Sequence, residues 1–324
     1  MVTLQDIRDA QARLSGVTVR TGLIQAPLDE AADGFAVRKL YLKPENLQPI
    51  GAFKLRGAYN KIASLSAEER SRGVITYSSG NHGQGVAYAA RALGAKAVIV
   101  MPNDAPAIKR EAAASMGGEI VLVGPSSLER QTRAEELAAK HGYVIVPPFN
   151  DEKIIAGQGT MGLEILEDLP EVETVLVPVG GGGMLSGVAT AIKLSKPSTK
   201  VIGVEPELAA DAQASLRAGT IVQSAAEQTS RTIADGLRTQ SIGAINFEHI
   251  RRYVDDILTV SEDEIRRATR WLATNPKTIA EPSGAVAVAG FLFHEDQLPS
   301  TTMNVAIISG GNIDPQLLRE IERA

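Results

Sequence analysis

Short runs rich in β-branched residues alternate along this chain with segments of helical length. Such runs lie at residues 73–77, 96–101, 119–123, 143–146, 174–179, 201–205 and 304–308, and helical patterns lie at 82–94, 106–116, 126–141, 153–168 and 184–196. This alternation is typical of β-α-β units, whose parallel strands are covered by helices on both faces. The runs are continuously apolar, as in strands buried on both faces. The sequence therefore predicts an α/β fold with parallel sheets.

A Pro-Pro pair at residues 147–148 divides these repeats into two groups. Four strand–helix repeats follow one another closely before it, which is enough for a compact sheet. The chain has 324 residues, a length that suits one large domain or two coupled ones. We predict a small domain at residues 73–149 and a larger one formed by residues 1–68 and 152–324. Ligands usually bind in a cleft between two such sheets.

Composition excludes several classes of function. The formal net charge is −5 and no basic stripe is visible, so we expect no nucleic-acid partner. The chain has no cysteine, which excludes disulfides, thiolate nucleophiles and cysteine-bearing zinc sites. The first 14 residues form an amphipathic pattern rather than a signal peptide, and no apolar run reaches the ~18 residues that span a bilayer. We therefore expect a cytoplasmic protein without a membrane partner.

Four consecutive glycines connect a strand to a helix in VPVGGGGMLSG, residues 177–187. Glycines at such a turn let backbone amides converge on a phosphate at the helix N-terminus, where the helix dipole favours negative charge. A flexible turn is the simpler alternative. The pattern is no P-loop, and as a dinucleotide fingerprint it has Leu185 or Ser186 in place of the third glycine. A dinucleotide-binding regulatory module stays open because Glu205 ends the next strand, where such folds bind a ribose.

Two other strands run into polar loops. YSSGNHGQG, residues 77–85, gathers hydroxyl, amide and imidazole groups that suit a carboxylate or a ring oxygen of a cofactor. A helix N-cap is the simpler interpretation, but it accounts for one polar residue and not for the cluster. VAIISGGNID, residues 305–314, is by itself a generic strand end.

Lys54 follows a phenylalanine in IGAFKLRGA, residues 50–58. The chain holds no G-x-S-x-G or H-E-x-x-H motif and only four histidines, which leaves Lys54 as the best nucleophile candidate. The alternative is a solvated lysine at a helix start. A lysine beside a phosphate site is what an enzyme needs to hold a phosphorylated aldehyde cofactor as a Schiff base.

Together these segments resemble a known family. GAFKLRGA, SSGNHGQG, GGGGM and SGGN follow one another in the order found in fold-type II pyridoxal-phosphate enzymes, which are tryptophan synthase β-like. The likeness extends to IAGQGT and TIADGLR, and it is greatest to the serine racemase and serine/threonine dehydratase group. It implies two open, twisted, mainly parallel sheets flanked by helices. It also implies pyridoxal 5′-phosphate as cofactor and a homodimer.

Carried over to the matching positions, the resemblance implies a role for each motif. Lys54 would form the Schiff base and remove the proton from the substrate Cα, and Phe53 would pack on the pyridine ring. Asn81 would bind the 3′-oxygen of the ring, and Ser309 would face the pyridine nitrogen, where a neutral hydroxyl favours β-elimination. The phosphate would be held by the backbone of Gly180, Gly181, Gly182, Gly183 and Met184.

The resemblance also implies how the substrate is held. Ser79 matches a serine that acts as second acid/base in racemases of this family, and because some dehydratases carry it too, it permits racemisation without requiring it. Arg130 matches an arginine that approaches the substrate in racemase-like relatives, with an exposed helix arginine as the alternative. Ala52 replaces a common serine, and Thr239 stands where relatives offer a serine near the substrate. The expected substrate contacts are Ser78, Ser79, Asn81, His82, Arg130 and Asn150.

The segment GVEPELAAD, residues 203–211, matches a divalent-cation site of serine racemase-like enzymes. The resemblance implies Glu205, the Ala209 carbonyl and Asp211 as ligands, completed by water and suited to Mg²⁺, Ca²⁺ or Mn²⁺. Outside that context, two acids at this spacing are usually surface residues.

The resemblance implies an ammonia-lyase that converts a β-hydroxy amino acid, such as L-serine or L-threonine, to a 2-oxo acid and ammonia. Serine racemase activity, alone or with elimination, and 3-hydroxyaspartate dehydratase activity are the alternatives within the family. The chain ends shortly after SGGN, so we expect a catabolic or racemase-type enzyme without the regulatory domain of feedback-inhibited threonine deaminases. A dinucleotide-binding module would leave Lys54 and the polar loop unexplained.

Overall fold

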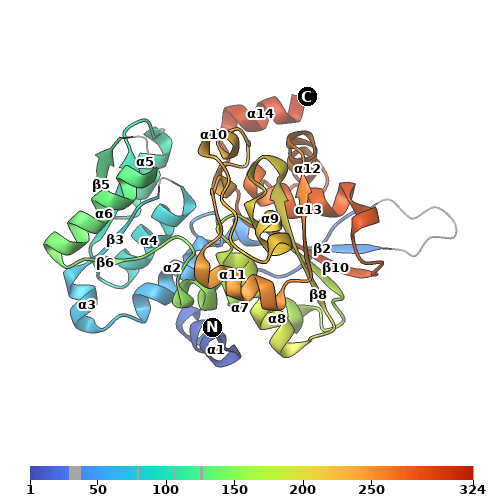
Figure 1. The fold of residues 1–324 in the computed structure, drawn as a ribbon, viewed down its shortest axis with the longest axis horizontal. Helices are drawn as coiled ribbons and strands as arrows, with labels where there is room; N and C mark the ends of the chain where they lie inside the picture. The colour runs from blue at the N-terminus through green and yellow to red at the C-terminus, as the bar shows by residue number, and fades with distance from the viewer. Residues whose placement is uncertain (29–37, 79, 106, 125–126, 324) are drawn as a thin grey trace.

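The computed structural model describes residues 1–28, 38–78, 80–105, 107–124 and 127–323. They form two sheets flanked by helices (Figure 1). The predicted α/β class with mainly parallel sheets is therefore confirmed. Within the described residues, no helix combines the length and the apolar character that a membrane crossing requires.

The larger sheet has six strands in the order β1-β2-β10-β7-β8-β9. Their bounds are Ile24–Gln25 for β1, Lys39–Pro44 for β2, Thr174–Pro178 for β7, Lys200–Pro206 for β8, Asp256–Val260 for β9 and Met303–Ile308 for β10. Only β1 is antiparallel to its neighbour; the other pairs are parallel. The last strand of the chain, β10, thus lies near the centre of the sheet, between β2 and β7.

The smaller sheet has four parallel strands in the order β5-β4-β3-β6. Their bounds are Val74–Thr76 for β3, Ala97–Pro102 for β4, Gly118–Val123 for β5 and Val144–Ile145 for β6. All four strands lie within residues 73–149, the segment proposed as the small domain; the domain boundaries themselves stay a prediction. Helix α2, Lys54–Ala63, packs against α4 of this sheet and also against α7 of the larger one, so it lies between the two sheets.

Helices cover the faces of both sheets. Their bounds are α1 Leu4–Leu14, α3 Ala67–Arg72, α4 Asn81–Ala92, α5 Ala107–Ser115, α6 Ser127–His141, α7 Glu152–Asp168, α8 Gly183–Ser195, α9 Asp211–Ala218, α10 Ala226–Thr229, α11 Ala244–Tyr253, α12 Glu262–Thr274, α13 Pro282–Phe293 and α14 Pro315–Arg323; short 3₁₀ turns are η1 Glu45–Leu47, η2 Glu207–Ala209, η3 Asp235–Leu237 and η4 Glu295–Gln297. On β10, Val305 and Ile307 pack into the core beneath α7 and α8, and Ala306 and Ile308 pack into the core beneath α12 and α13. This two-residue alternation places apolar side chains on both faces, as the continuous apolar runs predicted.

The sequence pattern missed three strands of the larger sheet: the two-residue β1, and the longer β2 and β9. β2 contains Lys39 and Lys43, and Lys43 is fully buried because its ammonium is paired with Glu164 of α7. β9 is an edge strand that begins at an exposed aspartate, Asp256. In β2 and β9 the charged residues masked the apolar pattern. The elements that these strands pack against come from distant parts of the sequence.

Candidate active site

Lys54 begins α2, and the segment before it is fastened to the end of β10. The backbone N–H of Phe53 donates to the Ser309 carbonyl oxygen at 3.0 Å. Ala52 forms an antiparallel bridge with Gly310. These contacts place the first turn of α2 beside the C-terminal end of the central strand, which is the edge of a parallel sheet where ligands bind.

The Lys54 amine lies in a partly buried position. Its Nζ donates to the carbonyl oxygen of Pro148 at 2.9 Å and lies 5.1 Å from the centre of the Phe53 ring. Burial lowers the pKa of Lys54 to about 8, because the charged form is poorly solvated there. A larger share of the amine is therefore unprotonated near neutral pH, which is the form that attacks an aldehyde.

The glycine turn connects β7 to α8 and packs against Phe149. A Cβ on Gly181 would lie 2.3 Å from the Phe149 ring, and Gly182 has a left-handed φ of +89°. The Gly181 carbonyl oxygen accepts from the Asn246 side-chain amide at 2.5 Å, so it points away from the turn's interior toward α11. The first amides of α8 have no partner within the helix and can receive an anion. Pro148 and Phe149 thus connect Lys54 to a turn that fits a phosphate.

Ser309 follows the central strand and is almost fully buried, with 3% of its surface exposed. Its hydroxyl donates to the carbonyl oxygen of Ser283 at 3.3 Å. A neutral hydroxyl supplies no negative charge to hold a facing pyridine nitrogen protonated. This arrangement fits the role that the family resemblance implies for Ser309.

Asn81, at the start of α4, makes two contacts across the space between the sheets. Its Nδ2 donates to Glu281 Oε1 at 2.6 Å, and its Oδ1 accepts from the Asn312 side-chain amide at 2.8 Å. Burial raises the pKa of Glu281 to about 7, and the negative charge of Asp235 adds to this shift. Gly51 allows Asn312 to approach, since a Cβ there would lie 2.3 Å from the Asn312 Oδ1.

His82 is buried, with 3% of its surface exposed. Its Nε2 lies 3.0 Å from the carbonyl oxygen of Val146, which can only accept, so Nε2 carries the hydrogen. Its Nδ1 has no hydrogen-bond partner within the described residues. Burial lowers the pKa of His82 to about 3, and the nearby charge of Lys54 contributes. His82 is therefore a neutral ring with one unused acceptor.

The other expected substrate contacts lie in different environments. The Ser78 hydroxyl accepts from the Gly80 amide at 3.4 Å within the polar loop. Ser79 lies outside the described residues. Arg130 is partly buried on α6; burial lowers its pKa, and Asp104 acts in the opposite direction. Asn150 Oδ1 accepts from the Ile245 amide at 2.9 Å and so fixes the start of α11. The substrate roles of these residues stay predictions.

The three proposed cation ligands lie between β8 and α9. Glu205 is fully buried, and its carboxylate accepts from the backbone amides of Gln213 at 2.7 Å and Ala212 at 3.2 Å. Asp211 is 1% exposed, and within the described chain neither of its carboxylate oxygens has a hydrogen-bond partner. Burial raises the pKa of Glu205 to about 8 and that of Asp211 to about 7. Two buried carboxylates, of which Asp211 has both oxygens without a partner in the described chain, fit a hard cation.

That site would need ligands besides acids. Among the described residues there is no group of three or more His, Cys, Asp or Glu side chains that could hold a metal ion. A cation would therefore rely on a backbone carbonyl and water to complete its coordination, as hard divalent cations commonly do.

Several residues of the site were not predicted from the sequence. Glu281 precedes a proline at a helix start and looks like an ordinary cap, yet its side chain caps no amide of α13. Asn246 and Phe149 support the glycine turn from distant positions. Lys109 of α5 pairs with Asp235 at 2.5 Å and forms a second link between the smaller and larger sheets. Only the proline after Glu281 offered a local signal, and it indicated a helix start rather than a site.

Comparison with known proteins agrees with this geometry. Residues 16–310 match the family model described as pyridoxal-phosphate dependent enzyme. The chain belongs to this family. Its cofactor is therefore pyridoxal phosphate, and the predicted family is confirmed.

Similar proteins in this family act on hydroxy amino acids. The chain is 47% identical to L-threonine ammonia-lyase of Thermotoga maritima over 99% of its own length and 78% of the relative. It is 41% identical to L-threo-3-hydroxyaspartate ammonia-lyase of Saccharomyces cerevisiae, over 96% of this chain and 94% of the relative. It is 37% identical to serine racemase of Schizosaccharomyces pombe, with the same two coverages.

Solved structures confirm the fold. A threonine deaminase from T.th. superposes with a TM-score of 0.89 at 45% identity, over 96% of this chain and 99% of that one. The maize serine racemase superposes with a TM-score of 0.91 at 38% identity, over 98% of this chain and 96% of that one. The predicted two-sheet arrangement of fold-type II pyridoxal-phosphate enzymes is thus confirmed.

Proposed function

We propose that this protein is a pyridoxal-phosphate-dependent ammonia-lyase that converts a β-hydroxy amino acid to a 2-oxo acid and ammonia. The observation that carries the proposal is the position of Lys54. Its amine has a lowered pKa, lies next to the end of β10, and is connected through Pro148 and Phe149 to the glycine turn. Relatives named threonine ammonia-lyase and hydroxyaspartate ammonia-lyase support the same reaction class.

The residues that would hold the cofactor come from four segments. Lys54 would hold it covalently and Phe53 would pack on its ring, while Asn81 would bind its ring oxygen and Ser309 would face its nitrogen. The phosphate would be held by Gly180, Gly181, Gly182, Gly183 and Met184. When bound, the cofactor supplies an electron sink for the bonds at the substrate Cα.

In the reaction, the side chain of Lys54 moves a proton, and the neighbouring His82 stays uncharged. The Lys54 amine, unprotonated above about pH 8, removes the proton from the substrate Cα. The β-hydroxyl then leaves as water, a loss whose proton is balanced by the one removed from Cα. Hydrolysis of the resulting enamine consumes one water and releases the 2-oxo acid and ammonia. His82 stays neutral at physiological pH, so it adds no positive charge beside Lys54.

A visible spectrum and a product assay test this proposal. The purified protein should absorb in the visible range when loaded with pyridoxal phosphate, and Lys54→Ala should lose both that absorbance and 2-oxo acid formation. L-threonine, L-serine and 3-hydroxyaspartate, assayed in parallel, would identify the substrate. A protein that takes up pyridoxal phosphate but releases no ammonia from any of the three would refute the lyase proposal.

Racemisation of serine is a second candidate function. The similarity to serine racemases of Schizosaccharomyces pombe and maize supports it, as does the serine at position 79. The two functions are separated by incubating the protein with L-serine and measuring pyruvate and D-serine together. If Ser79→Ala abolishes D-serine and spares pyruvate, Ser79 is the second acid/base; equal loss of both products would contradict this role.

Three further features belong to this proposal. We propose that Glu205, Ala209 and Asp211 bind Mg²⁺, Ca²⁺ or Mn²⁺, which the two buried carboxylates support. We also propose a cytoplasmic homodimer. The absence of cysteine and the common assembly of the resembling enzymes support it. Light scattering of the purified protein measures its oligomeric state, and a monomer at all concentrations would exclude the dimer.

A further inference from the structure

Four buried charged side chains form a cluster that includes α2, the helix of Lys54. They are Lys43, Glu45, Arg56 and Glu164, and they are called the Arg56 cluster below. Their side-chain exposure is 0% for Lys43, 7% for Glu164, 1% for Arg56 and 0% for Glu45. Two are positive and two negative, so the charges balance. Burying four charges is costly unless each is paired and hydrogen-bonded.

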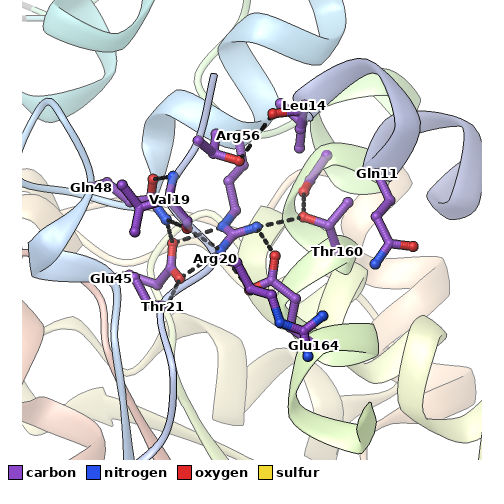
Figure 2. Close-up of polar contacts among 12 residues, drawn as sticks. Gln11, Leu14, Val19, Arg20, Thr21, Glu45, Gln48, Arg56, Thr160 and Glu164 are labelled. Carbon is purple, nitrogen blue, oxygen red and sulfur yellow. Dashed lines mark hydrogen bonds and ion pairs between the residues drawn. The ribbon is translucent and has the colours of Figure 1, made fainter. Parts of the chain in front are cut away.

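Arg56 is the centre of this cluster (Figure 2). Its Nε and Nη2 donate to the two carboxylate oxygens of Glu45 at 2.8 and 2.9 Å. Its Nη1 and Nη2 donate to the two oxygens of Glu164 at 2.7 and 2.8 Å. Nη1 also donates to the Thr160 hydroxyl at 3.1 Å, and Lys43 completes the pairing of Glu164 at 2.5 Å. A guanidinium can bind two carboxylates with such a planar fork, whereas an ammonium cannot.

The Glu45–Arg56 ion pair in this cluster keeps both of its charges over the working pH range. Burial alone would raise the pKa of Glu45, but Arg56 and Lys43 hold it below its usual value. Burial likewise opposes the charge of Arg56, and the two glutamates raise its pKa. The Glu45–Arg56 pair is therefore a permanent link and not a titrating switch.

The Arg56 cluster connects the elements that carry the cofactor contacts. Arg56 lies on α2, two residues after Lys54. Glu45 directly follows β2, which pairs in parallel with β10, the strand that leads to Ser309. Glu164 lies on α7, which packs along α8, and α8 begins in the glycine turn. The Arg56 guanidinium therefore connects three elements. These are α2, which carries the Lys54 amine; the end of β2, which pairs with the strand leading to Ser309; and α7, which packs along the helix of the glycine turn.

Helix α2 packs tightly against α7 next to Arg56. A Cβ on Gly157 would lie 2.7 Å from the Gly57 Cα, so α2 and α7 cross at close range. Because close-packed interiors transmit strain, we expect a change in the Arg56 cluster to move α2 relative to α7. A shift of α2 relative to α7 would displace the Lys54 amine while leaving the glycine turn on α8 in place.

We propose that Arg56 is a positioning residue that fixes the Lys54 amine relative to the glycine turn and Ser309. This inference rests on the proposed function. It predicts that covalent attachment, in which the Lys54 nitrogen bonds to the aldehyde carbon of pyridoxal phosphate and one water is released, depends on Arg56. Binding of the phosphate group alone does not.

The test compares two cofactor forms on protein stripped with hydroxylamine. Pyridoxal phosphate reports attachment through the rate at which visible absorbance appears. Pyridoxine phosphate has the ring and phosphate but no aldehyde, so its dissociation constant reports the non-covalent contacts of the site without the bond to Lys54. The variants are Arg56→Lys and the milder Glu164→Gln. The control is Leu272→Ala, a fully buried core residue of α12 whose truncation lowers the melting temperature without touching α2.

In Arg56→Lys, attachment is expected to slow by about 10- to 100-fold, the cost of a misplacement near 1 Å, while pyridoxine phosphate binds as in the wild type. Glu164→Gln should show a smaller change in the same direction, and it carries the test if Arg56→Lys does not fold. Leu272→Ala should change neither. Attachment at the wild-type rate in both cluster variants, or equal loss of both ligands, would overturn the proposal. A wild-type protein that binds neither form overturns the proposed function as well.

Discussion

The Asn81 side-chain amide donates to the buried Glu281 carboxylate across 2.6 Å, and this contact joins α4 of the smaller sheet to α13 of the larger one. Glu281 stands directly before α13 but caps none of its amides. Its carboxylate is directed instead at the residue expected to bind the ring oxygen of the cofactor. Because the Asn81 amide would contact both Glu281 and the cofactor, we expect cofactor binding and the ionisation of Glu281 to be linked.

Replacing Glu281 with glutamine is expected to remove a pH-dependent instability. Burial and the charge of Asp235 raise the pKa of Glu281 from 4.5 to about 7. Between these values the folded protein binds more protons than the unfolded chain, so the contribution of Glu281 to the free energy of unfolding falls as the pH rises. The stability of Glu281→Gln relative to the wild type should therefore rise over this window by up to about 3 kcal/mol.

Urea unfolding of the cofactor-free proteins at pH 5 and pH 8 measures this difference. Glu205 and Asp211 also have raised pKa values, and they add the same pH dependence to both proteins. Their effect cancels in the comparison. A stability difference that is the same at both pH values would contradict the assigned pKa of Glu281.

The rate of cofactor attachment is expected to follow the ionisation of Lys54. Burial lowers the pKa of Lys54 from 10.5 to about 8, so the reactive free amine increases with pH and saturates above about pH 8. Mixing the cofactor-free protein with pyridoxal phosphate between pH 6.5 and pH 10 and following visible absorbance gives this profile. A rate that still climbs steeply above pH 9 would show an ordinary lysine, and Lys54→Arg should give no attachment at any pH.

The parts of the site that the sequence could predict are those whose chemistry is local. A glycine turn between a strand and a helix binds phosphate through its own backbone, and Lys54 stands out because competing nucleophile motifs are absent. The position of Ser309 at a strand end was also local, but its importance came from resemblance and then from its contact with Phe53.

The parts that the sequence could not predict depend on pairing over long distances. Glu281 and Asn81 are 200 residues apart, and Lys43 and Glu164 are 121 apart. A buried charge makes a segment look exposed until its partner is known, which is why the strand around Lys43 was missed. Asn246 looks like any polar helix residue until the fold brings it to the Gly181 carbonyl.

Divalent cations are expected to stabilise this protein more strongly as the pH rises. Cation binding requires ionised carboxylates, and the raised pKa values of about 8 for Glu205 and about 7 for Asp211 mean that protons compete below these values. Saturating Mg²⁺ or Ca²⁺ should raise the melting temperature by roughly 5 °C at pH 8.5 and by much less at pH 6.

Asp211→Asn should abolish this stabilisation, because one of the two charges is lost. Asp263→Asn is the matched control, since Asp263 is an exposed acid on α12 with 77% of its side chain accessible. Melting curves with chelator and with added cation measure both variants. An equal response of Asp211→Asn and the wild type would place any cation elsewhere.

Filling the glycine turn is expected to remove phosphate binding, and trimming Phe149 should restore it. A Cβ on Gly181 would lie 2.3 Å from the Phe149 ring, so Gly181→Ala must displace the ring or the turn and should destabilise the protein by roughly 1–3 kcal/mol. Because the ring is the obstacle, Gly181→Ala combined with Phe149→Ala should bind pyridoxine phosphate better than Gly181→Ala alone. Gly22→Ala is the control, since no atom lies within 4 Å of its added Cβ. If the double variant binds no better than the single one, the turn fails through its own backbone and not through Phe149.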